Sequence, residues 1–247
     1  MKMGEPLSLT RVKSAIRKPR KGVTGKSMIF KDRSDAGKQL ADTLAERLKD
    51  NVDTTTLHIL VLPRGGVPVA FEIAQRLKAP LDTFIVRKLG LPGNEELAMG
   101  AIASGGSVVL NESLIQQLQV PRSSIDLVMR QESKELERRE SLYNSGYIAQ
   151  EIKGKNIILI DDGLATGASL QVAVLALRPF SPATITVAVP VAAQRGLDEL
   201  RMMVDNVISL QILQPEESVS HWYDDFTQTT HVEVINLLQK AHGRKIA

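Results

Sequence analysis

Short apolar runs alternate with amphipathic stretches along most of the chain. In the amphipathic stretches, apolar residues recur at helical spacing, as Leu40, Leu44 and Leu48 do. Polar residues bound the apolar runs, and such runs suit strands that are buried on both faces of a parallel sheet. The pattern predicts strands at residues 58–62, 83–86, 101–103, 107–110, 156–160, 184–189 and 206–210, and helices at 35–48, 68–77, 123–143, 169–177, 194–203 and 231–241.

The alternation of strands with helices predicts an α/β fold with a mostly parallel, Rossmann-like sheet flanked by helices. Residues 89–148 interrupt this alternation as an inserted loop and helix region. Within it, the polar and highly charged stretch 123–143 predicts a long, largely exposed helix. Residues 215–229 are irregular and contain the single tryptophan. We therefore expect one domain over residues 27–247.

Positive charge is concentrated at the start of the chain. Residues 1–26 hold eight lysine or arginine residues and one acid, Glu5, which gives +7, so the chain's net charge of +3 leaves −4 for the rest. The segment has no sustained periodicity, which predicts a basic, flexible arm. Such an arm can bind nucleic acid or another polyanion, and a solvated arm without a partner is the alternative interpretation.

The amino-acid composition argues against a membrane-spanning, secreted or disulfide-bonded protein. The apolar fraction of 43% and the charged fraction of 24% are ordinary for a globular protein. No apolar stretch approaches the roughly 20 residues that span a bilayer, and the basic N-terminus lacks the apolar core of a secretory signal. There are no cysteines, which excludes disulfides and thiolate metal sites. We expect a cytoplasmic protein with no membrane partner.

The segment 157–169, Ile-Ile-Leu-Ile-Asp-Asp-Gly-Leu-Ala-Thr-Gly-Ala-Ser, carries the strongest functional signal. Its apolar residues lead into Asp161 and Asp162, which places these acids at the carboxyl end of a strand, where open α/β sheets bind ligands. Small residues and hydroxyls follow at a helix N-terminus, which suits a phosphate. A sugar phosphate with free hydroxyls fits this combination, and a turn with an Asx cap is the alternative. The phosphate-binding candidates are Ala165, Thr166, Gly167, Ala168 and Ser169.

Two further predicted strands end in cations. Arg64-Gly65-Gly66 combines a guanidinium with glycines that allow the backbone to approach a ligand closely. Arg87 and Lys88 follow the next predicted strand and suggest phosphate binding. Ordinary turns and surface pairs have the same compositions, so neither motif decides the function by itself.

Together these motifs resemble a known family. The 157–169 segment is similar to the phosphoribosyl-pyrophosphate (PRPP) signature of the type I phosphoribosyltransferases, with Ser169 where threonine is commoner. Residues 64–66 match the family's pyrophosphate loop. The resemblance covers residues 30–240 as a fold, and these two motifs are its specific part. The stretch 222–226 and others are similar to a group of bacterial proteins of this type whose acceptor is not settled.

The resemblance implies a Mg²⁺-dependent transfer of phosphoribosyl from PRPP to a nitrogen acceptor, in the first place a nucleobase, with release of pyrophosphate. It implies that Asp161 and Asp162 accept hydrogen bonds from the ribose hydroxyls, directly or through metal-bound water, and that residues 165–169 hold the 5′-phosphate. The Arg-Gly-Gly loop would grip the pyrophosphate, and Lys88, with Arg87, would neutralise it as it leaves. The ion would be held mainly by substrate oxygens, as Mg²⁺ prefers, rather than by direct protein ligands.

The resemblance also implies a flexible catalytic loop and a hood over the acceptor. The loop falls within 89–148, where no residue can be assigned to it. The hood falls at about 212–230, where Trp222, Tyr223 and Phe226 form the densest aromatic cluster. Trp222 and Tyr223 are therefore candidates for stacking on the acceptor, and a core plug that closes the sheet edge is the alternative. The family commonly forms dimers, which the long exposed helix can support, so a homodimer is a further expectation.

A second function, from another class, fits the same motifs. It is a non-catalytic regulator that senses PRPP or a nucleotide and binds nucleic acid through the basic arm at 1–26. The 157–169 loop serves both functions and does not separate them. The Arg-Gly-Gly motif and Lys88 favour the enzyme, because a sensor has less need of groups that stabilise a leaving pyrophosphate. PRPP-forming pyrophosphokinases share the fold and a similar loop, but they have two such domains and this chain shows one.

Overall fold

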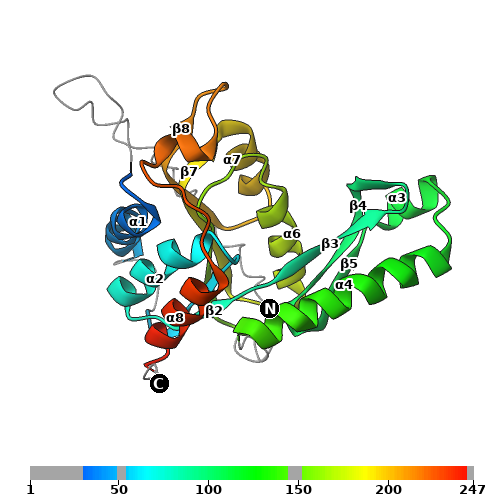
Figure 1. Ribbon diagram of the computed structural model, residues 1–247, viewed down its shortest axis with the longest axis horizontal. Coiled ribbons are helices and arrows are strands. Elements are labelled where there is room, and N and C mark those ends of the chain that lie inside the picture. The colour runs from blue at the N-terminus through cyan, green and yellow to red at the C-terminus, as the bar shows by residue number, and fades with distance from the viewer. Residues whose placement is uncertain (1–29, 49–53, 144–151, 244–247) are drawn as a thin grey trace, which may run out of the picture.

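The computed structural model describes residues 30–48, 54–143 and 152–243, so the arm predicted at 1–26 lies outside the described residues. At the centre is a parallel sheet of five strands in the order β2-β1-β6-β7-β8 (Figure 1). This order places β6, the strand that precedes the two acids, between β1 and β7. The strands are β1 (Leu57–Val61), β2 (Leu81–Thr83), β6 (Asn156–Ile160), β7 (Thr184–Ala193) and β8 (Asn206–Leu213).

Helices cover both faces of this sheet. Alternate residues of β6 belong to two apolar clusters: Ile158 and Ile160 pack in the cluster that contains α1, α2 and α8, and Ile157 and Leu159 pack in the cluster that contains α6 and α7. Burying each such side chain stabilises the fold by about 1.5–3 kcal/mol, which explains why the strand is apolar on both faces. The helices are α1 (Arg33–Leu48), α2 (Gly66–Leu77), α6 (Ala168–Leu177), α7 (Gln194–Arg201) and α8 (His231–Ala241).

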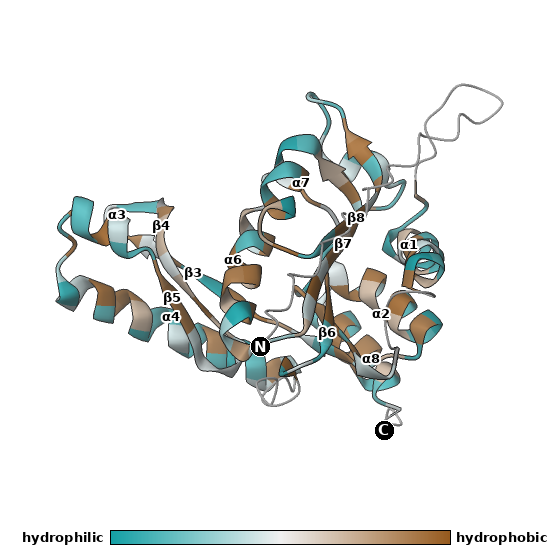
Figure 2. Ribbon diagram, turned by 180° about the vertical axis from the view of Figure 1, so that it is seen from behind, coloured by the Kyte–Doolittle hydropathy of each residue, from teal (hydrophilic) through white to brown (hydrophobic). Residues whose placement is uncertain are grey.

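A second, antiparallel sheet in the order β3-β4-β5 projects from the parallel one (Figure 1). The turn of its first hairpin contains Gly93, whose φ of 83° is a conformation that glycine adopts without strain. Helix α4 runs alongside this sheet and buries Ile125, Leu136 and Tyr143, and hydrophilic and hydrophobic segments alternate along it in Figure 2. The elements are β3 (Val86–Leu91), β4 (Asn94–Ala103), β5 (Ser107–Leu110), α3 (Glu112–Gln117) and α4 (Arg122–Tyr143).

The predicted α/β class and the predicted long helix at 123–143 are confirmed. The predicted strand at 83–86 is wrong, because β2 of the parallel sheet ends at Thr83 and β3 of the antiparallel sheet begins at Val86. Phe84 and Ile85 between them are buried. The apolar run therefore marks the buried junction of the two sheets, where burial rather than strand pairing requires apolar residues.

The segment after β8 folds back over the carboxyl edge of the parallel sheet. It contains a short 3₁₀ helix, η4 (Val219–Trp222), and its Trp222 carbonyl accepts a hydrogen bond from the Phe30 backbone N–H at 2.8 Å. Other 3₁₀ turns are η1 (Thr54–Thr56), η2 (Ser104–Gly106) and η3 (Arg178–Phe180). Among the described residues, no helix combines the length and the apolar character that a membrane span requires.

Candidate active site

The two adjacent acids lie directly after β6, at the carboxyl edge of the parallel sheet. The chain beyond them is fixed to the neighbouring strand, because the Leu164 backbone N–H donates to the Val191 carbonyl at 2.9 Å. Gly167 then turns the chain into α6 with a φ of 79°. A side chain other than glycine is strained in that conformation, so the glycine is needed where the loop meets the helix.

Residues 165–169 form an open loop at the N-terminus of α6. Every residue of the loop except Gly167 is exposed. Within the described part of the chain, the backbone N–H groups of Thr166 and Gly167 have no hydrogen-bond acceptor. Unpaired N–H groups at the positive end of a helix dipole attract an anion. The loop can therefore attract an anion from solvent.

Asp161 is partly buried at the sheet edge. Its Oδ1 accepts a hydrogen bond from the Asp162 backbone N–H at 2.9 Å. Burial and the neighbouring charge of Asp162 raise the pKa of Asp161 well above its usual value, although the Asp162 N–H and the Arg33 charge partly offset the increase. A carboxyl group with a strongly perturbed pKa at a sheet edge is a candidate functional group.

Asp162 is held from two sides by residues far away in the sequence. Arg33 at the start of α1 donates from Nε to Asp162 Oδ2 at 2.7 Å and from Nη1 to the Thr227 carbonyl at 2.7 Å. The guanidinium carbon of Arg33 also lies 3.9 Å from the centre of the Phe226 ring. On the other side, the Tyr223 hydroxyl donates to the Asp162 carbonyl at 2.6 Å. These contacts fix the Asp162 carboxylate and leave Oδ1 to accept from a ligand.

The Arg-Gly-Gly loop after β1 packs directly against the two acids. A Cβ atom placed on Gly65 would lie 2.2 Å from Asp162 Oδ2, and one placed on Gly66 would lie 3.0 Å from the Asp161 Cα. The Pro63–Arg64 peptide bond before them is cis. Contact with Asp162 explains Gly65. Gly66 is explained by its packing against both Val61, whose Cγ2 would lie 2.8 Å from a Cβ atom, and the Asp161 backbone. The two motifs that the sequence singled out are thus neighbours in space.

A cavity of about 640 Å³ opens beside Asp162 and Gly65. Its volume lies within the range of small-molecule sites. Asp162 is its one acidic lining residue among those that the structure describes. The lining residues are Arg33, Pro63, Arg64, Gly65, Arg138, Arg139, Tyr143, Asp162, Phe226, Gln228, Thr229 and His231.

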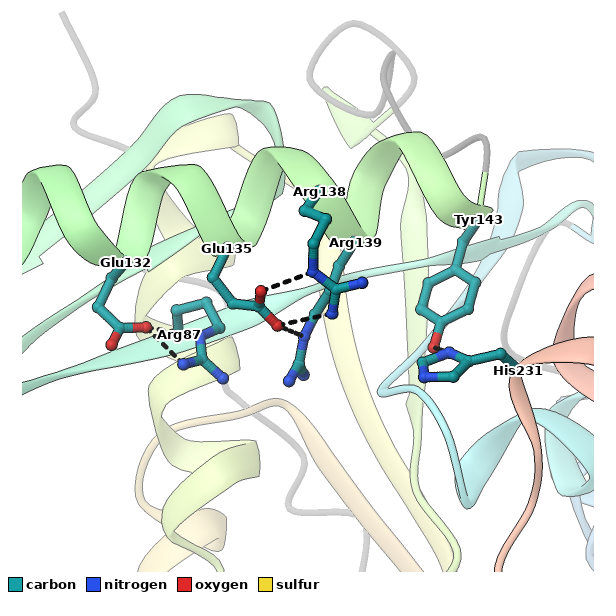
Figure 3. Close-up of polar contacts among 7 residues, drawn as sticks. All are labelled: Arg87, Glu132, Glu135, Arg138, Arg139, Tyr143 and His231. Atoms are coloured by element: carbon teal, nitrogen blue, oxygen red, sulfur yellow. Dashed lines mark hydrogen bonds and ion pairs between the residues drawn. The ribbon is translucent and has the colours of Figure 1, made fainter.

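The expected cation pair does not line this cavity. Arg87 and Lys88 lie inside β3 rather than at the end of a strand of the parallel sheet. Arg87 pairs with Glu132 of α4 at 2.6 Å, as Figure 3 shows, and Lys88 is exposed. The sequence misplaced the pair because it extended the preceding strand through the junction between the sheets.

The aromatic residues expected to stack on an acceptor are buried. Trp222 and Tyr223 are 6% and 5% exposed and belong to a third apolar cluster with Phe30. The Trp222 indole N–H donates to Glu217 at 3.0 Å. This environment favours the alternative that the sequence left open, a plug that closes the sheet edge. Of the three aromatic residues, Phe226 lines the cavity.

Several cavity residues were not found by sequence reasoning. Arg138 and Arg139 come from the end of α4, and both donate to the carboxylate of Glu135 (Figure 3). Nearby, the Tyr143 hydroxyl is 2.7 Å from His231 Nδ1, which links α4 to α8. In sequence these residues are part of a charged helix and of a helix start, and no local pattern separates them from surface residues.

The chain is similar to proteins of known sequence and structure. A family model for the phosphoribosyl transferase domain matches residues 93–225. A Mycobacterium tuberculosis protein named "Putative phosphoribosyl transferase" is 37% identical over 214 residues, which are 87% of this chain and 47% of that protein. The chain thus spans about half the length of this relative. The "Bifunctional protein PyrR" of Listeria welshimeri is 33% identical over 125 residues, which are 47% of this chain and 67% of that protein.

Among solved structures, that of the Thermus thermophilus protein TT1426 superimposes with a TM-score of 0.74 at 34% identity. The similarity covers 86% of this chain and 99% of that one. The family match spans more than half of the chain and includes the whole 157–169 segment. The chain therefore belongs to the phosphoribosyl transferase family.

Proposed function

We propose that the protein is a Mg²⁺-dependent phosphoribosyltransferase, which moves phosphoribosyl from PRPP to a nitrogen acceptor, expected to be a nucleobase, and releases pyrophosphate. The observation that carries this proposal is the contact between the two motifs. Gly65 lies so close to Asp162 that a Cβ atom would be 2.2 Å from its carboxylate. A ligand that reaches the Arg-Gly-Gly loop therefore also meets the Asp162 carboxylate. Asp161 and residues 165–169 do not line this cavity, and the proposal extends the ligand from Asp162 to them along the chain.

Each part of PRPP has a chemically matched surface. The N–H groups of residues 165–169 and the hydroxyls of Thr166 and Ser169 suit the 5′-phosphate. Asp161 and Asp162 suit the ribose hydroxyls, and Arg64 with its glycine neighbours suits the pyrophosphate. The role expected of Arg87 and Lys88 stays a prediction, because neither lines the cavity. Stacking of the acceptor on Trp222 or Tyr223 stays one too, and burial of both rings speaks against it.

In the reaction, a bond forms between the acceptor nitrogen and C1 of the ribose while the bond between C1 and the pyrophosphate oxygen breaks. The bonding electrons leave with pyrophosphate, and an acceptor N–H proton passes to water. Positive charge develops on the ribose ring as the bond breaks. The chain's own contribution is to hold both reactants in line, to place carboxylates near the developing cation and to neutralise the leaving group.

The residues present fit a metal ion that is held mainly by the substrate. Within the described ranges, no three His, Cys, Asp or Glu side chains are grouped closely enough to hold a metal ion. Asp161 and Asp162 offer carboxylate oxygens at the right place, and Asp162 Oδ2 is already engaged by Arg33. Mg²⁺ bound with PRPP would supply charge neutralisation to the pyrophosphate, and the two acids would hold its water ligands.

Pyrophosphate release tests the proposal. Purified protein would be incubated with PRPP, Mg²⁺ and a panel of purines, pyrimidines and amines, with a chelator as the control for the metal. Release that depends on both acceptor and Mg²⁺ is the expected result. If no acceptor led to pyrophosphate release, the proposed phosphoribosyltransferase activity would be contradicted. The protein could instead bind RNA or DNA in a salt-sensitive way and lose this binding when residues 1–26 are deleted. Together with the absence of release, that result would support the regulator hypothesis in place of the enzyme.

A further inference from the structure

Beyond Arg64, the cavity has further cationic side chains to which the proposed binding of PRPP assigns no role. Its far wall is formed by Arg138 and Arg139 of α4 and His231 of α8. Arg33 is neutralised by Asp162, the one acid among the described lining residues. The side chains of Arg138 and Arg139 are 56% and 34% exposed, so both are accessible to an anionic ligand from solvent.

The protein itself supplies one partner for the two α4 arginines. Glu135 accepts from Arg138 Nε at 2.7 Å and Nη2 at 3.0 Å, and from Arg139 Nε at 2.7 Å (Figure 3). The hydrogen bonds from Arg138 and then Arg139 lower the pKa of Glu135 to about 2, so this carboxylate is ionised at neutral pH. It orients both guanidinium groups, and it neutralises one of them.

Arg138, Arg139 and Glu135 together carry a formal charge of +1, and Arg64, which also lines the cavity, adds another positive charge. Among the described residues, no hydrogen bond or ion pair engages the Arg64 guanidinium. Each arginine carries five N–H donors, and Arg139 uses one of them on Glu135. Planar groups with several free donors are suited to carboxylate and phosphate oxygens.

The same region offers little to an uncharged aromatic ring. Trp222 and Tyr223 are buried, and Phe226 has the Arg33 guanidinium over its ring at 3.9 Å. The Tyr143 ring stacks on His231 with centroids 5.7 Å apart. The aromatic rings near the cavity are thus engaged by the protein, and recognition there falls to the cations.

We propose that Arg138 and Arg139 form an anion subsite for the acceptor, which therefore carries a carboxylate or phosphate group besides its nucleophilic nitrogen. The inference rests on the proposed function, because it names the class of acceptor that the same site takes. The volume of about 640 Å³ supports it, since this is the size of a site for a whole small molecule rather than for one phosphate group. The leaving pyrophosphate is the competing source of negative charge, and the experiment separates the two.

The experiment uses pairs of acceptors that differ in charge: uracil with orotate, its carboxylated analogue, and nicotinamide with nicotinate. Binding is measured by calorimetry in the presence of Mg²⁺, and transfer is measured as pyrophosphate released from PRPP. The test variant is Arg138→Gln with Arg139→Gln. The matched control is Arg122→Gln on the same helix, where Arg122 pairs with Asp126 and is 73% exposed, away from the cavity.

We expect at least one anionic probe to bind about tenfold more tightly than its neutral partner, since hydrogen bonds to charged groups are the stronger ones. The double variant should lose this advantage and keep the affinity for pyrophosphate, and Arg122→Gln should behave as the unaltered protein. Equal binding within both pairs would overturn the subsite. An equal loss of pyrophosphate and acceptor affinity would assign the arginines to the leaving group instead.

Failure of the proposed function has a different signature. In that case no acceptor releases pyrophosphate, while an anionic probe still binds and the double variant still abolishes the binding. Conversely, neutral and anionic acceptors could react at equal rates, and the double variant could leave these rates unchanged. That result would support the proposed enzyme activity and contradict the anion subsite.

Discussion

The two sides of the candidate site are assembled in different ways. On the β6 side, both acids and the phosphate loop come from one segment, residues 161–169. On the cavity side, Arg33, Arg64, Arg139 and His231 come from α1, the loop after β1, α4 and α8. The first side is fixed by local backbone geometry and the second by tertiary packing. The difference determines which residues a sequence can disclose.

The two sides also differ in their electrostatics. On the β6 side, burial and an adjacent carboxylate raise the pKa of Asp161. On the cavity side, arginines outnumber carboxylates. Asp162 belongs to both, because it follows β6 and pairs with Arg33. Changes at this shared boundary should therefore have the largest effects.

The largest expected effect comes from Gly65→Ala. The new methyl group would meet Asp162 Oδ2 at 2.2 Å and separate the two sides. A displacement of about 1 Å in a catalytic group can lower turnover by about 100-fold, and we expect a loss of this order in pyrophosphate release.

Binding of inorganic phosphate, which has no ribose hydroxyls to meet Asp162, serves as the control for Gly65→Ala and is measured by calorimetry. The three atoms nearest to a Cβ on Gly65 all belong to Asp162 and none to the loop at 165–169. We expect it to be retained together with the circular dichroism spectrum. A variant with unaltered turnover would show that the contact between the two motifs has no part in the reaction.

Asp162→Asn should have the second largest effect. It keeps the shape of the side chain but removes the charge that pairs with Arg33 and that we propose faces the ribose. We expect turnover to fall by at least about tenfold with the fold intact, because a carboxylate near the developing cation is lost. Asp126→Asn, which changes a partly exposed acid on α4, is the matched control. Unchanged steady-state kinetics of Asp162→Asn would remove this carboxylate from the proposed mechanism.

The sequence was sufficient to locate four of the five strands of the parallel sheet, β1, β6, β7 and β8, but not β2. Strands that are buried on both faces must be apolar throughout, as the run Ile157–Ile160 is, and such runs are visible without a structure. The run at 83–86 is also mostly apolar but lies at the junction of two sheets. Burial requires apolar residues in both cases, so hydrophobicity alone does not separate a strand from a junction.

In the candidate site, the residues that could be predicted from the sequence are those that lie in one contiguous motif. Asp161, Asp162 and Gly167 were found because strand end, acid pair and helix start follow one another. Arg33 was missed because its partner Asp162 is 129 positions away. No periodicity records a contact of that kind, and only the packing of α1 against the sheet creates it.

A smaller effect is expected from Arg33→Gln, and it tests how the two sides are linked. The charge of Arg33 lowers the pKa of Asp161, so its removal should raise that pKa further. If ribose binding needs ionised Asp161, the acid limb of the pH–rate profile should move to higher pH. We expect a several-fold loss of activity on the acid side of the profile that shrinks as the pH rises. Arg33→Lys keeps the charge and should return the acid limb to its position in the unaltered protein. If the acid limb lay at the same pH in all three proteins, Arg33 would not influence the ionisation of Asp161 in the reaction.

The smallest expected effect is on stability, from Asp161→Asn. A carboxyl group whose pKa is raised in the folded protein holds its proton more tightly there than in the unfolded chain. Its ionisation therefore destabilises the fold as pH rises above about 3.9, the usual pKa of an aspartate, and up to the folded value. Asparagine has no such penalty, and its Oδ1 can still accept from the Asp162 N–H.

The melting temperature of Asp161→Asn should thus exceed that of the unaltered protein at about pH 8 and match it near pH 4. A gain of about 2–4 °C corresponds to roughly 1 kcal/mol for a chain of this size. Arg33 bears on the sign, because it stabilises ionised Asp161 and reduces the gain. A lower melting temperature at the higher pH would mean that the cavity side stabilises the Asp161 charge by more than burial destabilises it. In that event the arginines would hold Asp161 ionised before a ligand binds, and the charge of Asp161 would not destabilise the fold without its ligand.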